Sequence, residues 1–95
     1  MKVIVESNLT IQNIFEPPIE FYIDDEAVTL RDLLEKVSNT CTTIQLLRDG
    51  ELGDDLRNIS VNGKEYFSLP NGLRTILKDG DTVNLEIYME PLGGG

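Results

Sequence analysis

Two stretches of the chain alternate between apolar and polar residues, as β-strands with one buried face do. The first covers residues 19–24 and the second covers residues 82–88. Their apolar positions are Ile19, Phe21, Ile23, Val83, Leu85 and Ile87, and their outward positions include Glu20, Asn84, Glu86 and Tyr88. A third stretch, Val3-Ile4-Val5, is apolar and β-branched at every position, which favours a central strand over an edge strand. The pattern therefore predicts strands at these three places.

The clearest signal in the sequence is a helix that begins at Thr29. Apolar residues at positions i, i+3, i+4 and i+7 lie on one stripe of a helix, and here they are Leu30, Leu33, Leu34 and Val37. Thr29 is a good N-cap, and Asp32 stands three residues later, as a capping-box partner does. The stripe predicts that one face of the helix packs on a sheet. We also expect a contact between Val28 and Leu33, an ion pair between Asp32 and Lys36, and an end of the helix at Asn39.

Turn signals divide the second half of the chain into short elements. Asn62-Gly63 is the preferred pair for a type I′ turn and predicts a hairpin. Its strands contain Ile59 and Val61 before the turn and residues 64–67 after it. Further predictions are turns at residues 70–72 and 78–81 and a single helical turn within residues 73–77.

Two stretches leave alternatives open. In residues 8–18, Pro17-Pro18 cannot donate ladder hydrogen bonds, so the apolar residues before it either extend a strand or lie in a loop. In residues 40–57, apolar residues favour a short strand that joins the core, between turns at residues 49–51 and 53–55. The apolar residues concerned are Ile11, Ile14 and Phe15 in the first stretch and Ile44, Leu46 and Leu47 in the second.

The order of these elements is strand, strand, helix and then several short strands. Such an order is typical of an α+β layer structure in which one main helix packs on a sheet. Ninety-five residues make one domain with a modest core. We divide the chain into a folded domain, residues 1–88, and a flexible glycine-rich C-terminal tail, residues 89–95.

The tail finishes with three glycines, Gly93-Gly94-Gly95. Glycine loses more backbone freedom on ordering than any other residue and has no side chain to bury, so these residues contribute little to a fold. A backbone without Cβ atoms can instead slide into a narrow channel that excludes side chains. Fully extended, residues 89–95 reach roughly 23 Å, far enough to carry the Gly95 carboxylate deep into another protein. The alternative is a frayed end or a linker.

The formal charge of -9, from 17 acidic and 8 basic residues, limits the partners. Such a surface repels phosphate backbones, so we expect neither nucleic acid nor an anionic membrane as a partner and favour a basic protein surface. Cys41 is the only cysteine, which indicates a reducing compartment. The N-terminal residues lack the apolar core of a signal peptide, and no apolar run approaches the ~20 residues that span a bilayer. The prediction is a cytoplasmic protein.

The sequence holds no histidine, which removes the commonest general base and the commonest metal ligand. Cys41 has no basic neighbour in sequence that would activate it, so we interpret it as a small packing residue. The acidic residues at 24–26, 49–51 and 54–55 lack the ligand spacing of a calcium loop and are interpreted as solvated charges. We therefore expect no metal site, no cofactor and no catalytic machinery of the chain's own.

The remaining chemical group of interest is the C-terminal carboxylate. At neutral pH it is an anion and a poor electrophile, so it reacts only after another enzyme activates it, most simply as an acyl-adenylate made with ATP. Sulfide would then displace the adenylate and give a thiocarboxylate, whereas an amine would give an amide. The chain would be a protein cosubstrate and not an enzyme. Apolar residues beside the tail, with Tyr88 and Phe67, either pack at an edge or form a docking patch for a partner.

Four segments carry a family resemblance when they are taken together and in order. They are residues 29–36 after a strand, the hairpin Ser60-Val61-Asn62-Gly63-Lys64, the run LKDGDTV at residues 77–83, and the terminal Gly94-Gly95. Over about residues 20–95 the chain resembles the ubiquitin-like sulfur-carrier family, which includes the small subunit of molybdopterin synthase and the thiamine-pathway sulfur carrier. The resemblance implies a β-grasp fold, with a mixed sheet packed on one main helix. It also implies a terminal glycine that a ubiquitin-activating-type enzyme adenylates and that is converted to a thiocarboxylate.

Carried over by position, Gly95 would bear the sulfur and Gly94 would be the second member of the required glycine pair. Residues expected to contact the partner are Gly93, Leu92, Pro91, Met89 and Phe67. The implied partners are an ATP-dependent adenylating enzyme and the sulfur-accepting subunit of a synthase, in which this chain could be the small subunit. The pathway served would be that of molybdopterin, thiamine or another cofactor. Two alternatives stay open: a ubiquitin-like modifier joined through Gly95 to lysines of other proteins, and a plain interaction domain.

Overall fold

A computed structural model describes residues 1–24, 28–40, 46–48, 51–53 and 55–88. In chain order the elements are β1 (Lys2–Ser7), β2 (Ile19–Tyr22), β3 (Val28–Thr29), α1 (Leu30–Thr40), β4 (Leu47–Arg48), β5 (Glu51–Leu52), β6 (Leu56–Val61), β7 (Lys64–Glu65), the 3₁₀ turns η1 (Tyr66–Ser68) and η2 (Gly72–Arg74), β8 (Ile76–Leu77) and β9 (Thr82–Ile87). Cys41, Ile44 and the tail, on which the sequence makes predictions, lie outside the described residues.

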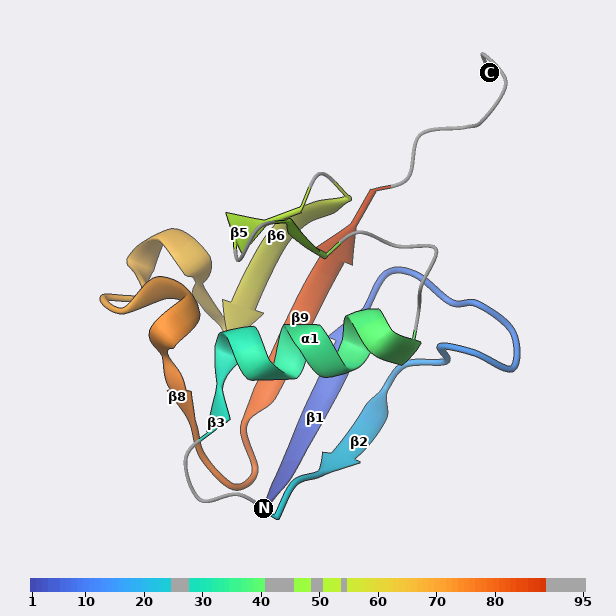
Figure 1. Cartoon of the computed structure of the whole chain (residues 1–95), viewed down its shortest axis with the longest axis horizontal. Coiled ribbons are helices and arrows are strands. Elements are labelled where there is room, and N and C mark those ends of the chain that lie inside the picture. Colours follow the sequence, from blue (N-terminus) through green and yellow to red (C-terminus); the bar gives the residue numbers. More distant parts are fainter. Residues whose placement is uncertain (25–27, 41–45, 49–50, 54, 89–95) are drawn as a thin grey trace.

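Five strands form the main sheet, in the order β2-β1-β9-β6-β7 (Figure 1). β1 and β9 run parallel, whereas the pairs β1–β2, β6–β9 and β6–β7 are antiparallel. α1 lies across one face of this sheet. The α+β fold predicted from the sequence, a mixed sheet packed on one main helix, is therefore confirmed. β1 lies inside the sheet, as its continuous apolar run predicted.

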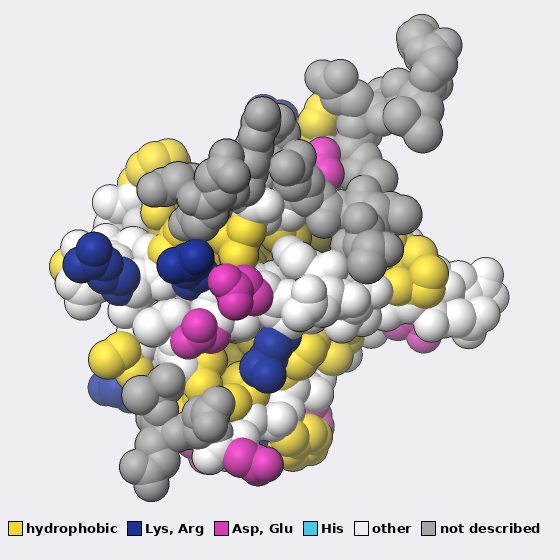
Figure 2. All heavy atoms as spheres, viewed as in Figure 1, with side chains coloured by type: hydrophobic (Ala, Val, Ile, Leu, Met, Phe, Trp, Pro, Cys, Tyr) yellow, Lys and Arg dark blue, Asp and Glu magenta, His cyan; other side chains and the backbone are white. Residues whose placement is uncertain are grey.

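The core lies between the sheet and α1. On β9, Val83, Leu85 and Ile87 are buried, while Asn84 and Glu86 face away from the helix and are exposed. The core residues are Val3, Val5, Phe15, Ile23, Val28, Leu30, Leu33, Leu34, Val37, Leu46, Leu56, Ile59, Val61, Leu77, Val83, Leu85 and Ile87. On the outer surface of α1, acidic and basic side chains lie close together (Figure 2). The predicted helix stripe and both predicted alternating strands are confirmed.

A capping box starts α1. Thr29 Oγ1 accepts a hydrogen bond of 3.2 Å from the Asp32 backbone N–H, and Asp32 Oδ2 accepts one of 3.0 Å from the Thr29 N–H. Two N–H groups that would otherwise lack an intrahelical partner are thus satisfied. Val28 and Leu33, the predicted staple, are both buried in the same core.

Replacing the cap residue tests this reading of the helix start. The Thr29→Ala variant is expected to lower the free energy of unfolding by about 1 kcal/mol, because an alanine at the N-cap cannot accept the Asp32 N–H. Urea unfolding followed by circular dichroism measures this change, and Thr29→Ser, which keeps the hydroxyl, is the control. Equal stability of the alanine variant and the parent would contradict the capping role.

Two predictions for the helix are wrong. Asp32 forms no ion pair with Lys36, because its carboxylate is used in the cap. Among the described residues, the helix instead has an ion pair between Arg31 Nε and Glu35 Oε1 at 3.5 Å. The helix also continues past Asn39 to Thr40, where the Thr40 hydroxyl donates to the Lys36 carbonyl at 3.1 Å.

The predicted hairpin forms, but its second strand is short. Asn62 and Gly63 have φ angles of 52° and 84°, the positive values that a type I′ turn requires. β7 stops at Glu65, where residues 64–67 were expected to continue as a strand, because Tyr66 turns back onto the core and opens η1. The predicted turn within residues 73–77 is right in part: η2 covers its beginning, and β8 then pairs with β3.

The structure decides both stretches that the sequence left open. Residues 8–18 form a loop in which Ile11 and Phe15 bridge each other; Phe15 is completely buried and its neighbour Ile14 is 53% exposed. In the second stretch, Leu46 is buried and Leu47 starts β4, which pairs with β5. The expected short strand is therefore present in part: Leu46 joins the core outside a strand, the strand itself is Leu47–Arg48, and Ile44 lies outside the described residues.

Candidate functional site

The described structure ends at the carboxyl end of β9, directly before the glycine-rich tail in sequence. The end of β9 is bonded on both sides. Toward β1 the Asn8 side chain bonds both backbone groups of Ile87 at 2.8 Å, and on the other side Leu56 of β6 lies opposite Ile87 in the register. The next residue, Tyr88, donates its N–H to the Asp55 carbonyl at 2.8 Å. The backbone that leads into the tail is thus held through Tyr88.

Three exposed side chains surround this strand end. The Arg57 guanidinium carbon lies 5.8 Å from the centre of the Tyr88 ring, and Arg57 Nε lies 4.0 Å from Glu86 Oε1. All three side chains are at least half exposed, so these contacts contribute little to stability. They are accessible to a partner that takes hold of the chain at this point.

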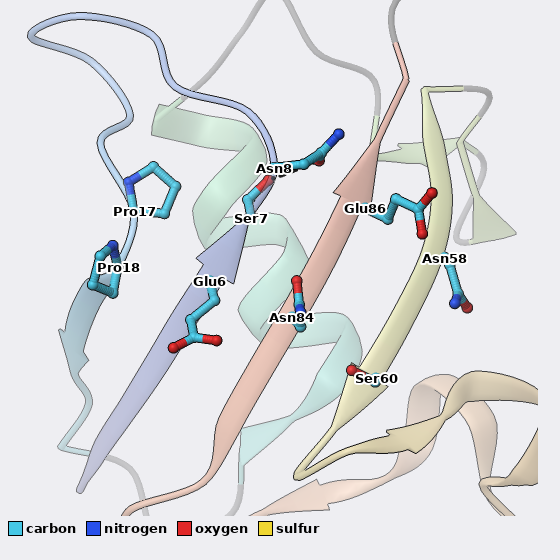
Figure 3. A pocket seen from close by; sticks show the side chains of 9 residues that line it. All are labelled: Glu6, Ser7, Asn8, Pro17, Pro18, Asn58, Ser60, Asn84 and Glu86. Carbon is cyan, nitrogen blue, oxygen red and sulfur yellow. Dashed lines mark hydrogen bonds between the residues drawn. The ribbon is translucent and has the colours of Figure 1, made fainter.

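A polar hollow of about 540 Å³ lies beside them, on the sheet face opposite α1 (Figure 3). Its lining comes from β1, β6, β9 and the loop before β2: Glu6, Ser7, Asn8, Pro17, Pro18, Asn58, Ser60, Asn84 and Glu86. The two charged residues of this lining, Glu6 and Glu86, are both acidic. Carboxylates, amides and hydroxyls present hydrogen-bond acceptors to a basic side chain.

An exposed pair on β2 continues this polar face. Tyr22 Oη donates to Glu20 Oε2 at 2.6 Å, and Lys2 Nζ lies 3.8 Å from Glu20 Oε1. The Tyr22 hydrogen bond, with the Lys2 charge beside it, lowers the pKa of the Glu20 carboxyl. The same hydrogen bond raises the pKa of the Tyr22 phenol, because its proton is shared with an anion.

Of the residues predicted to contact a partner, Phe67 is the one that the structure describes. Its side chain is 89% exposed, and its ring meets Tyr66 edge to face at 5.8 Å. It follows β7, which pairs with Ser60 and Val61 at the end of β6 remote from Ile87. The structure therefore does not bring Phe67 into the cluster around Tyr88. The roles of Met89, Pro91, Leu92, Gly93, Gly94 and Gly95 remain predictions, because these residues lie outside the described part of the chain.

Sequence reasoning missed Asn8, Asp55 and Arg57. Asn8 contacts a residue 79 positions away, and no local pattern marks that pairing. Among the described residues, no group of three or more acidic or cysteine side chains has the arrangement of a metal site. No described helix has the length and apolarity that crossing a membrane requires.

Of three comparisons with known proteins, the search of solved structures found matches. No family model matches the chain, and no curated protein matches it. The HVO 2177 protein of Haloferax volcanii is 26% identical, with a TM-score of 0.71 over 95% of this chain and 85% of that one. SAMP1 of the same organism is 19% identical, with a TM-score of 0.67 over 100% of both chains. A putative molybdopterin converting factor subunit 1 from Pyrococcus furiosus is 22% identical, with a TM-score of 0.64 over 93% of this chain and 98% of that one.

These structures agree with the expectation drawn from the sequence. Two of them are named as a molybdopterin converting factor subunit and as a small archaeal modifier protein, and the match extends over nearly all of each chain. The β-grasp fold is thereby confirmed, and so is the resemblance to the ubiquitin-like sulfur-carrier family.

Proposed function

We propose that this β-grasp chain is a sulfur-carrier protein whose Gly95 carboxylate is activated by a partner enzyme. The proposal takes Gly95 as the last residue of the mature protein. The observation that carries it is a terminal Gly-Gly-Gly sequence a few residues after a strand end that is bonded on both sides, in a fold shared with a putative molybdopterin converting factor subunit. The chain itself acts as a protein cosubstrate.

The proposed chemistry has two steps, both on the terminal carboxyl group. A carboxylate oxygen attacks the α-phosphorus of ATP, and pyrophosphate leaves. Sulfide then attacks the acyl carbon, AMP leaves with the bonding electron pair, and a thiocarboxylate remains on Gly95. The general acids and bases of both steps are proposed to come from the partner, because the reacting carboxyl group at the end of an extended tail is bound inside the partner's active site.

The architecture supports this role mechanically. A rigid body that ends at Tyr88 keeps the attachment point of the tail fixed, so that docking of the body also places the tail. Residues 89–95 span roughly 23 Å when extended, which suits an active site inside a channel. Gly93 and Gly94 would occupy the narrow part of this channel, and Pro91, Leu92 and Met89 its mouth.

The proposed recipients are the adenylating enzyme and a synthase that accepts the sulfur. The structure from Pyrococcus furiosus, named as a subunit of a molybdopterin converting factor, supports a molybdopterin pathway in which this chain acts as the small subunit. Thiamine synthesis or another cofactor pathway uses the same activated group. We place the protein in the cytoplasm because its one cysteine and the ATP-dependent step suit a reducing compartment.

Charge should assist the docking of the body. With a net charge of -9 and an acidic lining in the sheet hollow, the chain should be attracted to a basic partner surface. Its affinity for the activating enzyme is expected to fall several-fold as salt rises from about 0.1 M to about 1 M, since the screening length shrinks from roughly 10 Å to roughly 3 Å.

Calorimetry at a series of salt concentrations measures this dependence. The double variant Glu6→Gln/Glu86→Gln is the matched control, and its affinity should vary less with salt because the hollow has lost its charges. An affinity of the parent protein that is indifferent to salt would contradict electrostatic steering.

A ubiquitin-like modifier is the second candidate, supported by the solved neighbour named small archaeal modifier protein 1. It uses the same activation, and its product is an amide between Gly95 and a lysine of another protein. Incubation of the chain with the activating enzyme of its host, ATP and sulfide separates the two. A carrier yields a thiocarboxylate, whereas a modifier yields adducts that resist thiol and denaturant. A plain interaction domain yields no ATP-dependent product, and it tolerates an extra residue fused after Gly95.

A further inference from the structure

The Asn8 side chain extends the parallel ladder between β1 and β9 by one step. Backbone pairing between these strands reaches Ser7 and Leu85. Beyond it, Asn8 Nδ2 donates to the Ile87 carbonyl and Asn8 Oδ1 accepts from the Ile87 N–H, both at 2.8 Å. One side-chain amide thus satisfies both backbone groups of the last residue of β9, as a strand residue would.

Ser7 helps to hold the Asn8 amide in place. Its hydroxyl lies 3.4 Å from Asn8 Oδ1 and accepts the Leu9 N–H at 3.1 Å, where the chain turns away from the sheet. Figure 3 shows both side chains where β1 ends, beside β9. The backbone of the loop can therefore leave the sheet while the side chain stays bonded to Ile87.

On the other side of β9, where Leu56 lies opposite Ile87, the bond is made by backbone groups: the Asp55 carbonyl accepts the Tyr88 N–H. Among the described residues, the backbone of Ile87 is thus held by a side chain, that of Asn8. Its removal would free one side of the strand end without deleting any core side chain, because Asn8 itself is exposed.

We propose that Asn8 is the positioning residue for the C-terminal tail. This rests on the proposed function, since a fixed attachment point matters where the tail must reach a distant reaction centre. Without Asn8 the last residues of β9 would fray and join the tail. Each freed residue must be ordered again in the transition state. The conformational entropy lost in ordering one residue corresponds to a roughly tenfold slower activation. Asn8 also lines the sheet hollow, but its amide is engaged by the backbone of Ile87 and it carries no charge to attract a basic partner, so the loss should fall on kcat more than on KM.

The test compares Asn8→Ala with the parent chain in pyrophosphate exchange with ATP, catalysed by the activating enzyme of the host. We expect kcat to fall about tenfold and KM for the chain to stay within about twofold. Asn8→Asp keeps the acceptor for the Ile87 N–H and loses the donor. Its kcat should lie between those of the parent and of Asn8→Ala. Thr29→Ala is the control for stability, because it removes a hydrogen bond at the start of α1 that does not involve β9, and it should leave kcat unchanged.

Hydrogen exchange of the isolated chain gives a second readout. The Ile87 amide should exchange about tenfold faster in Asn8→Ala, with Leu85 on the same strand as the internal reference. If the parent chain is active and Asn8→Ala changes neither kcat nor the exchange rate of the Ile87 amide, the role of Asn8 is overturned while the proposed function stands. A parent chain that the enzyme and ATP do not activate would overturn the proposed function, and this proposal with it. If Thr29→Ala loses as much kcat as Asn8→Ala, the effect of Asn8 comes from general stability, and the positioning role is overturned.

Discussion

Deletion of Gly95 is expected to abolish ATP-dependent activation, with a loss of at least about 100-fold in rate, while the domain melts at the same temperature as the parent. The shortened chain still ends in a glycine carboxylate. That carboxylate would lie one residue, roughly 3.5 Å, short of the reacting phosphorus. A misplacement of about 1 Å can already cost 100-fold, because reacting atoms must approach to roughly 3–3.5 Å.

Stability should not change because the last core residue in the described part of the chain is Ile87, eight positions before the deleted residue. Pyrophosphate exchange measures the activation, and thermal unfolding measures the fold. The control is Asn71→Ala, an exposed asparagine whose side chain makes no cap hydrogen bond, which should be activated as the parent is. Activation of the deletion variant at the parent rate would show that Gly95 is not the reacting residue.

The largest loss of stability is expected at Phe15. Replacing this residue by alanine should lower the free energy of unfolding by roughly 3–5 kcal/mol, because its side chain is completely buried and the truncation leaves a cavity in the core. Domains of this size have a total stability of about 5–15 kcal/mol, so the variant would be close to unfolding.

Ile14→Ala is the matched control, since the neighbouring side chain is 53% exposed. The free energy of unfolding of Ile14→Ala should differ from that of the parent by no more than about 0.5 kcal/mol. Urea unfolding of both variants gives the comparison. Similar losses in the two variants would mean that the loop does not contribute to the core as the structure has it.

Phe15 also shows where sequence reasoning stops. Residues 8–18 contain apolar residues without a period, and whether Ile14 or Phe15 enters the core depends on how the loop lies against distant strands. The burial of Phe15 is therefore set by tertiary packing, which no window of the sequence contains. Tyr66 is similar: its contact with the core ends β7 early, although the residues around it are good strand formers.

Elements whose signals are local were predictable. The α1 stripe, its capping box and the type I′ turn each depend on residues within a few positions of one another, and all three are present. The alternation along β9 was equally clear because its inner face meets one continuous core.

The candidate site divides in the same way. Its glycine tail is visible in the sequence as composition, whereas its base is built by Asn8, Asp55 and Ile87, which come from three separated parts of the chain. Phe67 was assigned to this site because of its apolar character, and the structure places it at the other end of β6. The structure thus shows what the sequence did not: the strand end that precedes the tail is held in place by Asn8 and Asp55.

The most direct test of the account is the intact mass of the chain after incubation with the activating enzyme of its host, ATP and sulfide. A sulfur carrier should gain the mass that corresponds to one sulfur in place of one oxygen, located at Gly95 by fragmentation and absent when ATP or Gly95 is removed. A mass that stays that of the free acid, under conditions in which the enzyme turns over ATP with this chain, would contradict the sulfur-carrier function. Covalent adducts that depend on Gly95 would identify a protein modifier instead.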